Sequence, residues 1–207
     1  MTVEFVHCTP NAEALIVKMA RVSNPDNENN LATAPKLLRY LIDHQHWSPF
    51  EMANLCVQIH TERDISAQIL RHRSFSFQEF STRYAQAQKP VVPKLRKQDR
   101  KNRQNSTNDL APITKKFFTI CIQVLYLMSA KLYKTMLYCG VAKETARRIL
   151  PLSTQTTLYM NGTLRSWIHY INVRESNETQ LEHRLIAEGC KQIFIEQFPA
   201  IGKAAFK

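Results

Sequence analysis

The sequence predicts an α+β fold, in which a small, mainly antiparallel sheet packs against several helices and the helices are in the majority. Long stretches carry apolar residues at helical spacing, whereas the run from Asn54 to His60 alternates polar and apolar side chains as a half-buried strand does. A chain of 207 residues is long enough for one sizeable hydrophobic core. With 44% apolar and 22% charged residues, the composition is that of an ordinary globular protein. We therefore expect residues 1–207 to form a single domain.

The first half of the chain is predicted to hold two strands and three helices. Thr9-Pro10 supplies a helix cap followed by a proline that suits the first helical turn. The asparagine-rich run from Asn24 to Asn30 breaks that helix, and Trp47 to Phe50 forms a turn. The expected elements are strands over Val3–Cys8 and Asn54–His60 and helices over Asn11–Arg21, Leu31–His44 and Glu62–Arg73.

The second half is predicted to be mainly helical. Its most apolar stretch, Phe117 to Ala130, is shorter than the ~20 residues that span a bilayer and contains polar residues, so we expect a core helix and no membrane association. A strand over Thr156–Met160 is expected to end in a turn at Asn161-Gly162. Helices are expected over Ala111–Tyr138, Lys143–Leu150, Thr163–Asn172 and Glu178–Phe198.

Lysine and arginine outnumber the acidic residues by 28 to 17, which gives a net charge of +11. Such a surplus must be solvated or matched by an anionic partner, and a solvated surface, nucleic acid, an anionic membrane or a small molecule with several phosphates would each suit it. The charge is densest at about residues 89–112, which contain three prolines and few large apolar side chains, so we expect a mobile basic loop. Because this segment lacks aromatic residues that would stack on bases, no nucleic-acid partner is expected, and a solvated loop or a lid that attracts anionic substrates is the simpler explanation.

The cysteines and histidines suggest neither a disulfide framework nor a metal site. The five cysteines are widely spread and form no Cys-x-x-Cys pair, so reduced, mostly buried thiols are expected. The first residues lack a basic region followed by an apolar run, which favours a cytoplasmic location. A metal-dependent phosphohydrolase built on His44, His46, His60 and Asp64 is an alternative, but the carboxylate spacing is too sparse, and no metal is expected.

The segment from Arg71 to Arg83 has the densest set of reactive or ligand-binding side chains. Within thirteen residues it contains three arginines, one histidine, one carboxylate and three serines. Arginine binds phosphate through a planar two-point fork, and serine hydroxyls with backbone N–H groups can complete such a site. The alternative is a solvated basic helix end anchored by phenylalanines. The four glycines rule out a Gly-x-Gly-x-x-Gly or Walker A loop, so a nucleotide or flavin has to be held in another way.

The order of residues in this segment resembles the signature of the flavin-dependent thymidylate synthases. There, Arg-His-Arg is followed by seven residues and a serine, as from Arg71 to Ser81 here. Other pieces follow in that family's order between Ala20 and Arg184, so the resemblance is not confined to one short string. They include Ala20-Arg21-Val22-Ser23, His46-Trp47-Ser48-Pro49-Phe50-Glu51, Glu144-Thr145-Ala146-Arg147, Leu164-Arg165-Ser166-Trp167, Asn172-Val173-Arg174 and Gln180-x-Glu182.

The resemblance implies a methyltransferase that converts deoxyuridylate (dUMP) to thymidylate (dTMP). It implies FAD as the cofactor, NADPH as the reductant of FAD, and 5,10-methylenetetrahydrofolate as the carbon donor, which leaves tetrahydrofolate. The share of the protein in this chemistry is to align the three molecules and to stabilise charge on the uracil ring. The resemblance also implies a homotetramer whose active sites lie at subunit interfaces.

The resemblance further assigns individual residues to the substrate and to the cofactor. Arg174 is implied as the catalytic residue, because a fixed guanidinium stabilises the deprotonated side of uracil without proton transfer. His46 is implied in folate or flavin handling. The residues implied for dUMP are Gln68, Arg71, Glu79, Phe80, Ser81, Thr82, Arg83, Arg147 and Arg174, and those implied for FAD are Ser23, Ser48, Glu51, Arg71, His72, Arg73, Ser74, Glu79, Asn161, Thr163, Arg165 and His169.

Some of these assignments compete with other interpretations. Ser81 invites the idea of a nucleophile, but nothing local supplies a base with an orienting group, so we assign it to substrate binding. The family often has histidine at the position of Glu178 and asparagine at that of His169, and residues 152–157 depart from its usual tyrosine-containing strand. Capping or turn duty is an equally good explanation for Ser23, Ser48 and Asn161.

Overall fold

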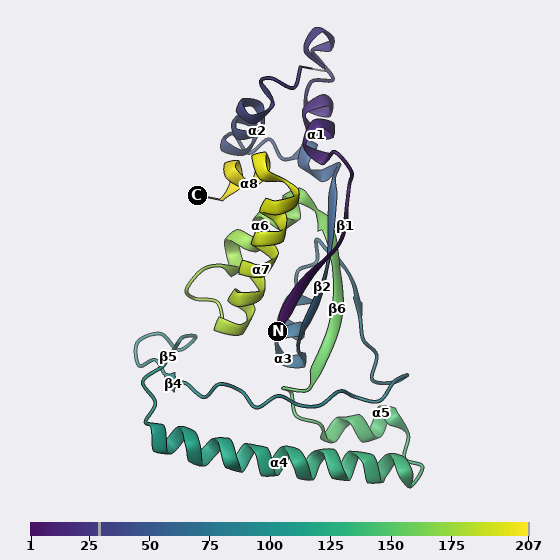
Figure 1. Cartoon of the computed structure of the whole chain (residues 1–207), viewed down its shortest axis with the longest axis vertical. Coiled ribbons are helices and arrows are strands. Elements are labelled where there is room, and N and C mark those ends of the chain that lie inside the picture. Colours follow the sequence, from purple (N-terminus) through teal and green to yellow (C-terminus); the bar gives the residue numbers. More distant parts are fainter. Residues whose placement is uncertain (29, 207) are drawn as a thin grey trace.

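A four-stranded antiparallel sheet runs through the middle of the chain, for which a computed structural model describes residues 1–28 and 30–206 (Figure 1). Asn29, part of the predicted break, and Lys207 lie outside the described residues. The strand order is β1-β2-β6-β3, so β6, from the second half of the chain, lies between two strands from the first half. The strands are β1 (Thr2–Cys8), β2 (Asn54–Glu62), β3 (Ser76–Glu79) and β6 (Gln155–Thr163).

The central pairing joins β2 and β6 along their whole lengths, from Asn54 opposite Thr163 to Glu62 opposite Gln155. This pairing makes the predicted turn at Asn161-Gly162 wrong. Both residues lie inside β6, because each pairs with β2 and Asn161 also pairs with Ser76 of β3. Asn161 and Gly162 therefore lie within a strand against which another part of the chain packs closely, and the chain does not reverse there.

Helices pack against the sheet and confirm the predicted α+β class, with helices in the majority. α6 contacts β2 and β6, whereas α7 contacts β1 and β2 (Figure 1). The core between these layers contains Trp167, Tyr170 and Phe194, all fully buried. The helical elements of residues 1–28, 30–90 and 154–206 are α1 (Ala12–Ala20), η1 (Pro25–Asn27), α2 (Ala34–Asp43), η2 (Ser48–Glu51), α3 (Arg63–Ile69), α6 (Leu164–Arg174), α7 (Leu181–Gln197) and α8 (Pro199–Ala205).

Several element boundaries differ from the prediction. α3 ends at Ile69, so the basic triplet of residues 71–73 lies in the turn that follows the helix. There the backbone N–H groups of Arg71 and His72 donate to oxygens three residues earlier. β3 and α8 are not apparent in the sequence, because a four-residue strand and a seven-residue helix are too short to show a period. Within the basic segment, residues 89–112, there are two-residue strands, β4 (Lys97–Gln98) and β5 (Ser106–Thr107).

The longest helix, α4 (Pro112–Tyr138), lies apart from the sheet (Figure 1). The predicted place of its apolar stretch in the core is wrong, because none of its most apolar window is buried in this chain. By length and composition α4 would also suit a membrane span, which is weak support for one. It packs on α5 (Lys143–Ala146) and on the turn η3 (Arg147–Ile149). Apolar spacing predicted the helix correctly but carries no information about what covers it.

The part of the chain that carries α4 leaves the sheet and returns to it at one place. The N–H of Val91 donates to the oxygen of Ser153 at 3.0 Å, and the N–H of Gln155 donates to the oxygen of Lys89 at 3.2 Å. Residues 91–153 therefore form an excursion that is closed at its base. The mobility of the basic segment within it stays a prediction.

The five cysteines are free thiols, as expected, but fewer of them are buried than expected. Cys56 and Cys190 are buried in the core, and Cys8 is half-buried. Cys121 and Cys139 are exposed because they lie on α4 and at its end, away from the core.

Candidate active site

The Arg71–Arg83 segment is held against the core by Phe75. Its buried ring packs against Trp167 and Tyr170, with centroid distances of 4.9 and 5.8 Å. The ring also lies directly over the backbone of Gly162, where a side chain would collide with it. Phe75 thus fixes the position of the segment on the core, and with it the positions of the polar residues on either side.

Gly162→Ala is expected to lower the free energy of unfolding by about 1–3 kcal/mol, since overpacking a filled core costs that much. A Cβ at this position would lie 2.7 Å from Cε1 of Phe75, and the ring cannot move without displacing its aromatic neighbours. Urea unfolding measures the effect. Gly189→Ala on α7 is the matched control, because its nearest neighbour is a Val3 methyl at 3.1 Å and alanine favours a helix. Equal stability of the Gly162 variant and the unmodified chain would contradict this packing.

On the substrate side of the segment, Glu79 is oriented by two hydroxyl groups. Ser66 Oγ and Thr156 Oγ1 donate to its Oε1 at 2.8 and 3.0 Å, and both donors are buried. Arg63 Nη1 lies 4.0 Å from the same oxygen. Phe80 then extends β3, because its N–H donates to the oxygen of Thr157. The Glu79 carboxylate is a fixed acceptor at the edge of the sheet.

Two of the arginines implied for phosphate lie next to this edge. Arg147 Nη1 donates to the hydroxyl of the buried Thr82 at 3.1 Å. Arg83 is exposed, and its Nη2 lies 3.5 Å from Glu144 Oε2. A shallow cavity of about 340 Å³ is lined by Arg83, Tyr84 and residues 142–144. Its charge and its location suit a phosphate group.

Arg174, the predicted catalytic residue, directly contacts His72. Its Nε donates to His72 Nε2 at 2.8 Å, although the two residues are 102 positions apart. An acceptor at Nε2 requires the neutral ring. Burial, together with the neighbouring charges of Arg174 and His169, lowers the pKa of His72 to about 4. The ring is therefore neutral at physiological pH, and it joins the residues implied for dUMP to those implied for FAD.

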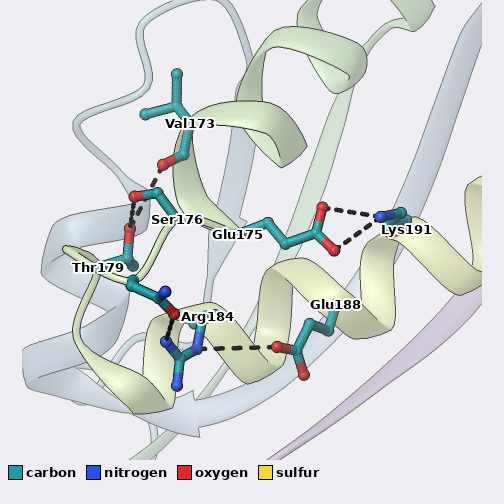
Figure 2. Close-up of polar contacts among 8 residues, drawn as sticks. Val173, Glu175, Ser176, Thr179, Arg184, Glu188 and Lys191 are labelled. Carbon is teal, nitrogen blue, oxygen red and sulfur yellow. Dashed lines mark hydrogen bonds and ion pairs between the residues drawn. The ribbon is translucent and has the colours of Figure 1, made fainter. Parts of the chain in front are cut away.

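The connection after Arg174 is tied to α7 by a set of polar contacts (Figure 2). Lys191 Nζ contacts both oxygens of Glu175, at 2.7 and 2.9 Å. Thr179 Oγ1 donates to the oxygen of Val173 at 3.4 Å, and Arg184 contacts both Asn177 and Glu188. The Lys191–Glu175 pair fixes the end of α6, where Arg174 is located, whereas Arg184 holds the later part of the connection at Asn177. Glu178 lies exposed in this connection.

Four residues implied for FAD line one cavity of about 480 Å³. These are Glu51, Ser74, Arg165 and His169, and an ion pair of 2.5 Å joins Arg165 Nη1 to Glu51 Oε1. Sequence reasoning missed the other lining residues, although Asn172 follows Arg165 and His169 at helical spacing on α6 and could have been found from that. The missed residues are Trp47, Ser166, Ile168 and Asn172.

On β6, outside the lining of this cavity, Asn161 Oδ1 is buried without a hydrogen-bond partner among the described residues. A buried acceptor without a partner is costly unless a ligand donates to it, and the N–H group of a flavin ring is such a donor. Together with the cationic Arg165, Asn161 makes the donor and acceptor set fit FAD. Thr163 instead caps α6, accepting a hydrogen bond from the N–H of Ser166 at 3.3 Å.

The other predicted residues are not joined to this cavity within the described chain. Ser23 lies exposed after α1, and Ser48 begins η2. His46 is exposed, with its ring 6.2 Å from that of His44. Arg71 and Arg73 are exposed and make no side-chain hydrogen bond or ion pair within residues 1–28 and 30–206.

The two alternative chemistries gain no support from the geometry. Ser81 Oγ accepts a hydrogen bond from the N–H of Arg83 at 3.4 Å, and no base lies within hydrogen-bond distance of it in the described part of the chain. Across the same residues, no three His, Cys, Asp or Glu side chains come close enough to hold a metal ion. The basic segment is also partly neutralised, because Arg96 pairs with Glu182 and Lys97 with Asp109.

A third cavity, of about 850 Å³, is larger than the two described above and is lined by none of the residues implied for dUMP or FAD. It lies between the basic segment, α3 and α7, where Arg96, Gln180 and Glu182 line it. It could not be predicted from the sequence, because Arg96 and Glu182 come from segments about ninety residues apart.

Comparison with known proteins shows the family of the chain. Residues 4–200 match the family described as thymidylate synthase complementing protein. The chain is 53% identical over 194 residues to a probable flavin-dependent thymidylate synthase of Paramecium bursaria Chlorella virus 1, covering 93% of this chain and 90% of the relative. The chain belongs to the flavin-dependent thymidylate synthase family. A second flavin-dependent thymidylate synthase, from Synechocystis sp., is 50% identical over 192 residues, covering 93% of this chain and 88% of the relative.

A solved structure supports the same membership. The UMP/dUMP methylase PolB from Streptomyces cacaoi, bound with 5-Br dUMP, superimposes with a TM-score of 0.86 at 25% identity, covering 98% of this chain and 93% of that one. Membership in the flavin-dependent thymidylate synthases confirms the resemblance on which the predicted enzyme class, methyltransferase, was based.

Proposed function

We propose that this flavin-dependent thymidylate synthase methylates dUMP to dTMP where the Arg71–Arg83 segment meets α6. The hydrogen bond from Arg174 to His72 carries this placement, because it joins the substrate side to the flavin side at 2.8 Å. FAD, when bound, supplies the hydride that completes the methyl group. NADPH is proposed as the reductant of FAD and 5,10-methylenetetrahydrofolate as the carbon donor.

On the substrate side, the residues of the chain act by charge and by fixed orientation. Arg147 and Arg83 bind the dUMP phosphate, since guanidinium forks suit its oxygens. Glu79 accepts a hydrogen bond from the nucleoside and is preoriented by Ser66. Arg174 stabilises the deprotonated side of uracil, and its bond to His72 leaves its terminal nitrogens available for the ring. The remaining proposed dUMP contacts are Gln68, Arg71, Phe80, Ser81 and Thr82.

On the flavin side, the cavity lined by Glu51, Ser74, Arg165 and His169 holds FAD. Arg165 meets its negative charge, and Asn161 accepts from its ring. Because His72 is neutral, it brings no second cation next to Arg174. Ser23, Ser48, Arg71, Arg73, Glu79 and Thr163 complete the proposed FAD set, with His46 in folate or flavin handling.

The exposed apolar side chains of α4 support a homotetramer with shared active sites. A monomer rarely leaves an apolar surface of this extent in water, and such a surface marks a contact with another chain. A closed symmetric assembly is the common way to cover it. The large apolar residues exposed on α4 are Ile113, Phe117, Phe118, Ile120, Val124, Leu125, Leu127, Met128, Leu132 and Tyr138.

We further propose that the enzyme works in the cytoplasm as a soluble protein. A membrane span for α4 competes with the tetramer for the same apolar surface, and the length and composition of one helix are weak support for a span. The basic segment serves to attract anionic substrates and not nucleic acid, since two of its cations are already paired.

Purified protein is expected to form dTMP from dUMP when FAD, NADPH and methylenetetrahydrofolate are all present, as measured by chromatography of the nucleotides. Leaving out dUMP or NADPH is expected to stop product formation.

In the same assay Ser81→Ala is expected to raise the KM for dUMP and to retain turnover, because Ser81 binds substrate. Complete loss of turnover in that variant, with normal dUMP and FAD binding, would restore the nucleophile interpretation.

A further inference from the structure

A row of hydrogen bonds runs from the buried core to the basic segment and passes through Gln68. It begins on α6, where the Tyr170 hydroxyl lies 3.1 Å from His183 Nε2, and both residues are fully buried. His183 Nδ1 lies 3.3 Å from Gln68 Oε1. Gln68 Nε2 then donates to Gln180 Oε1 at 2.8 Å.

The row ends at an ion pair in the wall of the 850 Å³ cavity. Gln180 Nε2 donates to Glu182 Oε2 at 3.1 Å. Arg96 donates to both oxygens of that carboxylate, at 2.5 and 2.8 Å, and its Nε donates to Ser106 Oγ at 2.7 Å. This is the two-point pairing that fixes a carboxylate most firmly. It anchors the basic segment to the start of α7.

The Glu182 carboxylate decides which group donates and which accepts in each hydrogen bond of the row. Burial raises the pKa of Glu182, but hydrogen bonds from Arg96, from its own backbone and from Gln180 lower it by more, so the group is ionised and only accepts. Gln180 must therefore turn its NH₂ group to Glu182 and its oxygen to Gln68. The same reasoning fixes the amide of Gln68, whose NH₂ group faces Gln180 and whose oxygen faces His183.

The orientation of Gln68 in turn fixes the tautomer of His183. An oxygen of Gln68 requires a proton on Nδ1, so Nε2 is unprotonated and accepts from the Tyr170 hydroxyl. Burial, assisted by Arg174 and His72, lowers the pKa of His183 to about 3, which keeps the ring neutral. Every donor in the row then has an acceptor. Reversing either amide would place a donor against a donor on one side and an acceptor against an acceptor on the other.

We propose that Glu182 and His183 are positioning residues, which hold the amide of Gln68 in the one orientation that recognises the uracil of dUMP. This inference rests on the proposed role of Gln68 in binding dUMP and assigns that role a cause. Arg96 is the anchor, so the basic segment contributes to substrate recognition through an ion pair without touching the substrate. Neither His183 nor Arg96 stands out in the sequence.

The first test is Glu182→Gln, which keeps the size of the side chain but replaces one acceptor oxygen by a donor. Arg96 and Gln180 then compete for a single oxygen, and the amide of Gln68 is no longer held in one orientation. The KM for dUMP is expected to rise about tenfold, the effect of one unsatisfied polar group. kcat is expected to change less than about threefold, because Gln68 binds ground state and transition state alike. An unchanged KM would overturn the proposal.

A pair of substitutions at His183 separates positioning from packing. Asparagine carries an N–H where Nδ1 is, so His183→Asn keeps the bond to Gln68 and loses the one to Tyr170. His183→Gln places an acceptor where Nε2 is, so it keeps the bond to Tyr170 and loses the one to Gln68. Only the glutamine variant is expected to raise the KM for dUMP, about tenfold. Thermal unfolding of both variants checks folding, and an equal rise in both would show a packing role alone.

A double substitution keeps this inference distinct from the proposed function. In a Gln68→Ala background, Glu182→Gln is expected to cause no further rise in KM, since it acts through an amide that is gone. Additive effects would overturn the proposal while leaving the enzyme activity established. If the unmodified protein formed no dTMP, the proposed function itself would fail, and a dUMP binding measurement on the same variants would still test the inference.

Discussion

Arg174→Ala is expected to lower kcat/KM for dUMP by about 10²–10³-fold, the usual effect of removing one charge-stabilising donor from an active site. The Arg174 guanidinium donates to His72 through Nε, which leaves its two terminal nitrogens for uracil. FAD binding, followed by flavin absorbance, is expected to persist, because the flavin cavity is not lined by Arg174. Steady-state kinetics with varied dUMP measure the loss.

Arg174→Lys tests whether charge alone is sufficient. Lysine keeps the positive charge but has one terminal nitrogen, so it cannot donate to His72 and to uracil in the same geometry. We expect it to recover only part of the lost activity. Arg184→Ala is the matched control, because Arg184 lies on the adjacent helix and contacts Asn177 and Glu188. Near-normal turnover by Arg174→Ala would refute the role of Arg174.

Leu127→Asp on α4 is expected to dissociate the tetramer and to abolish activity. Leu127 is 69% exposed in the single chain, and an unpaired carboxylate in a subunit interface costs several kcal/mol, of the order of 3–5. Since the proposed active site draws residues from more than one subunit, protomers without partners have incomplete sites. Light scattering gives the assembly state, and the nucleotide assay gives the activity.

Leu31→Asp is the control for that experiment. Leu31 is also exposed, at 55%, and it lies three residues before α2 (Ala34–Asp43), a helix at the opposite end of the view from α4 (Figure 1). The same change there is expected to leave both assembly and activity intact. A Leu127 variant that stays tetrameric would show that α4 is not the interface. A dissociated variant that remains fully active would show that one chain holds a complete site.

The sequence was a good guide to elements with a strong period and a poor guide to their surroundings. The alternation around Val57 and the apolar spacing of α7 both identified the correct structure. β3 escaped because its four residues pair with a strand eighty positions away, and only that pairing makes them a strand. The exposure of α4 could not be predicted, because periodicity reports an apolar face and not its partner.

The site was predicted by residue type and order, but its contacts were not. The resemblance named both Glu51 and Arg165, and the structure joins them in one ion pair. It also named His72 and Arg174, yet for different ligands, and their direct contact appears only in the folded chain. His183 was missed because a histidine within a helix has no distinguishing pattern, and its importance comes from burial and from partners on α3 and α6.

The closed base of the excursion has a consequence for how the protein comes to be assembled. Because a hydrogen bond joins Val91 to Ser153 within one chain, the four strands of the sheet pair without any contact from α4. Folding and assembly are then separate steps, and the second depends on protein concentration. Until the chains of the proposed tetramer associate, the apolar side chains of α4 stay exposed, and aggregation competes with correct association.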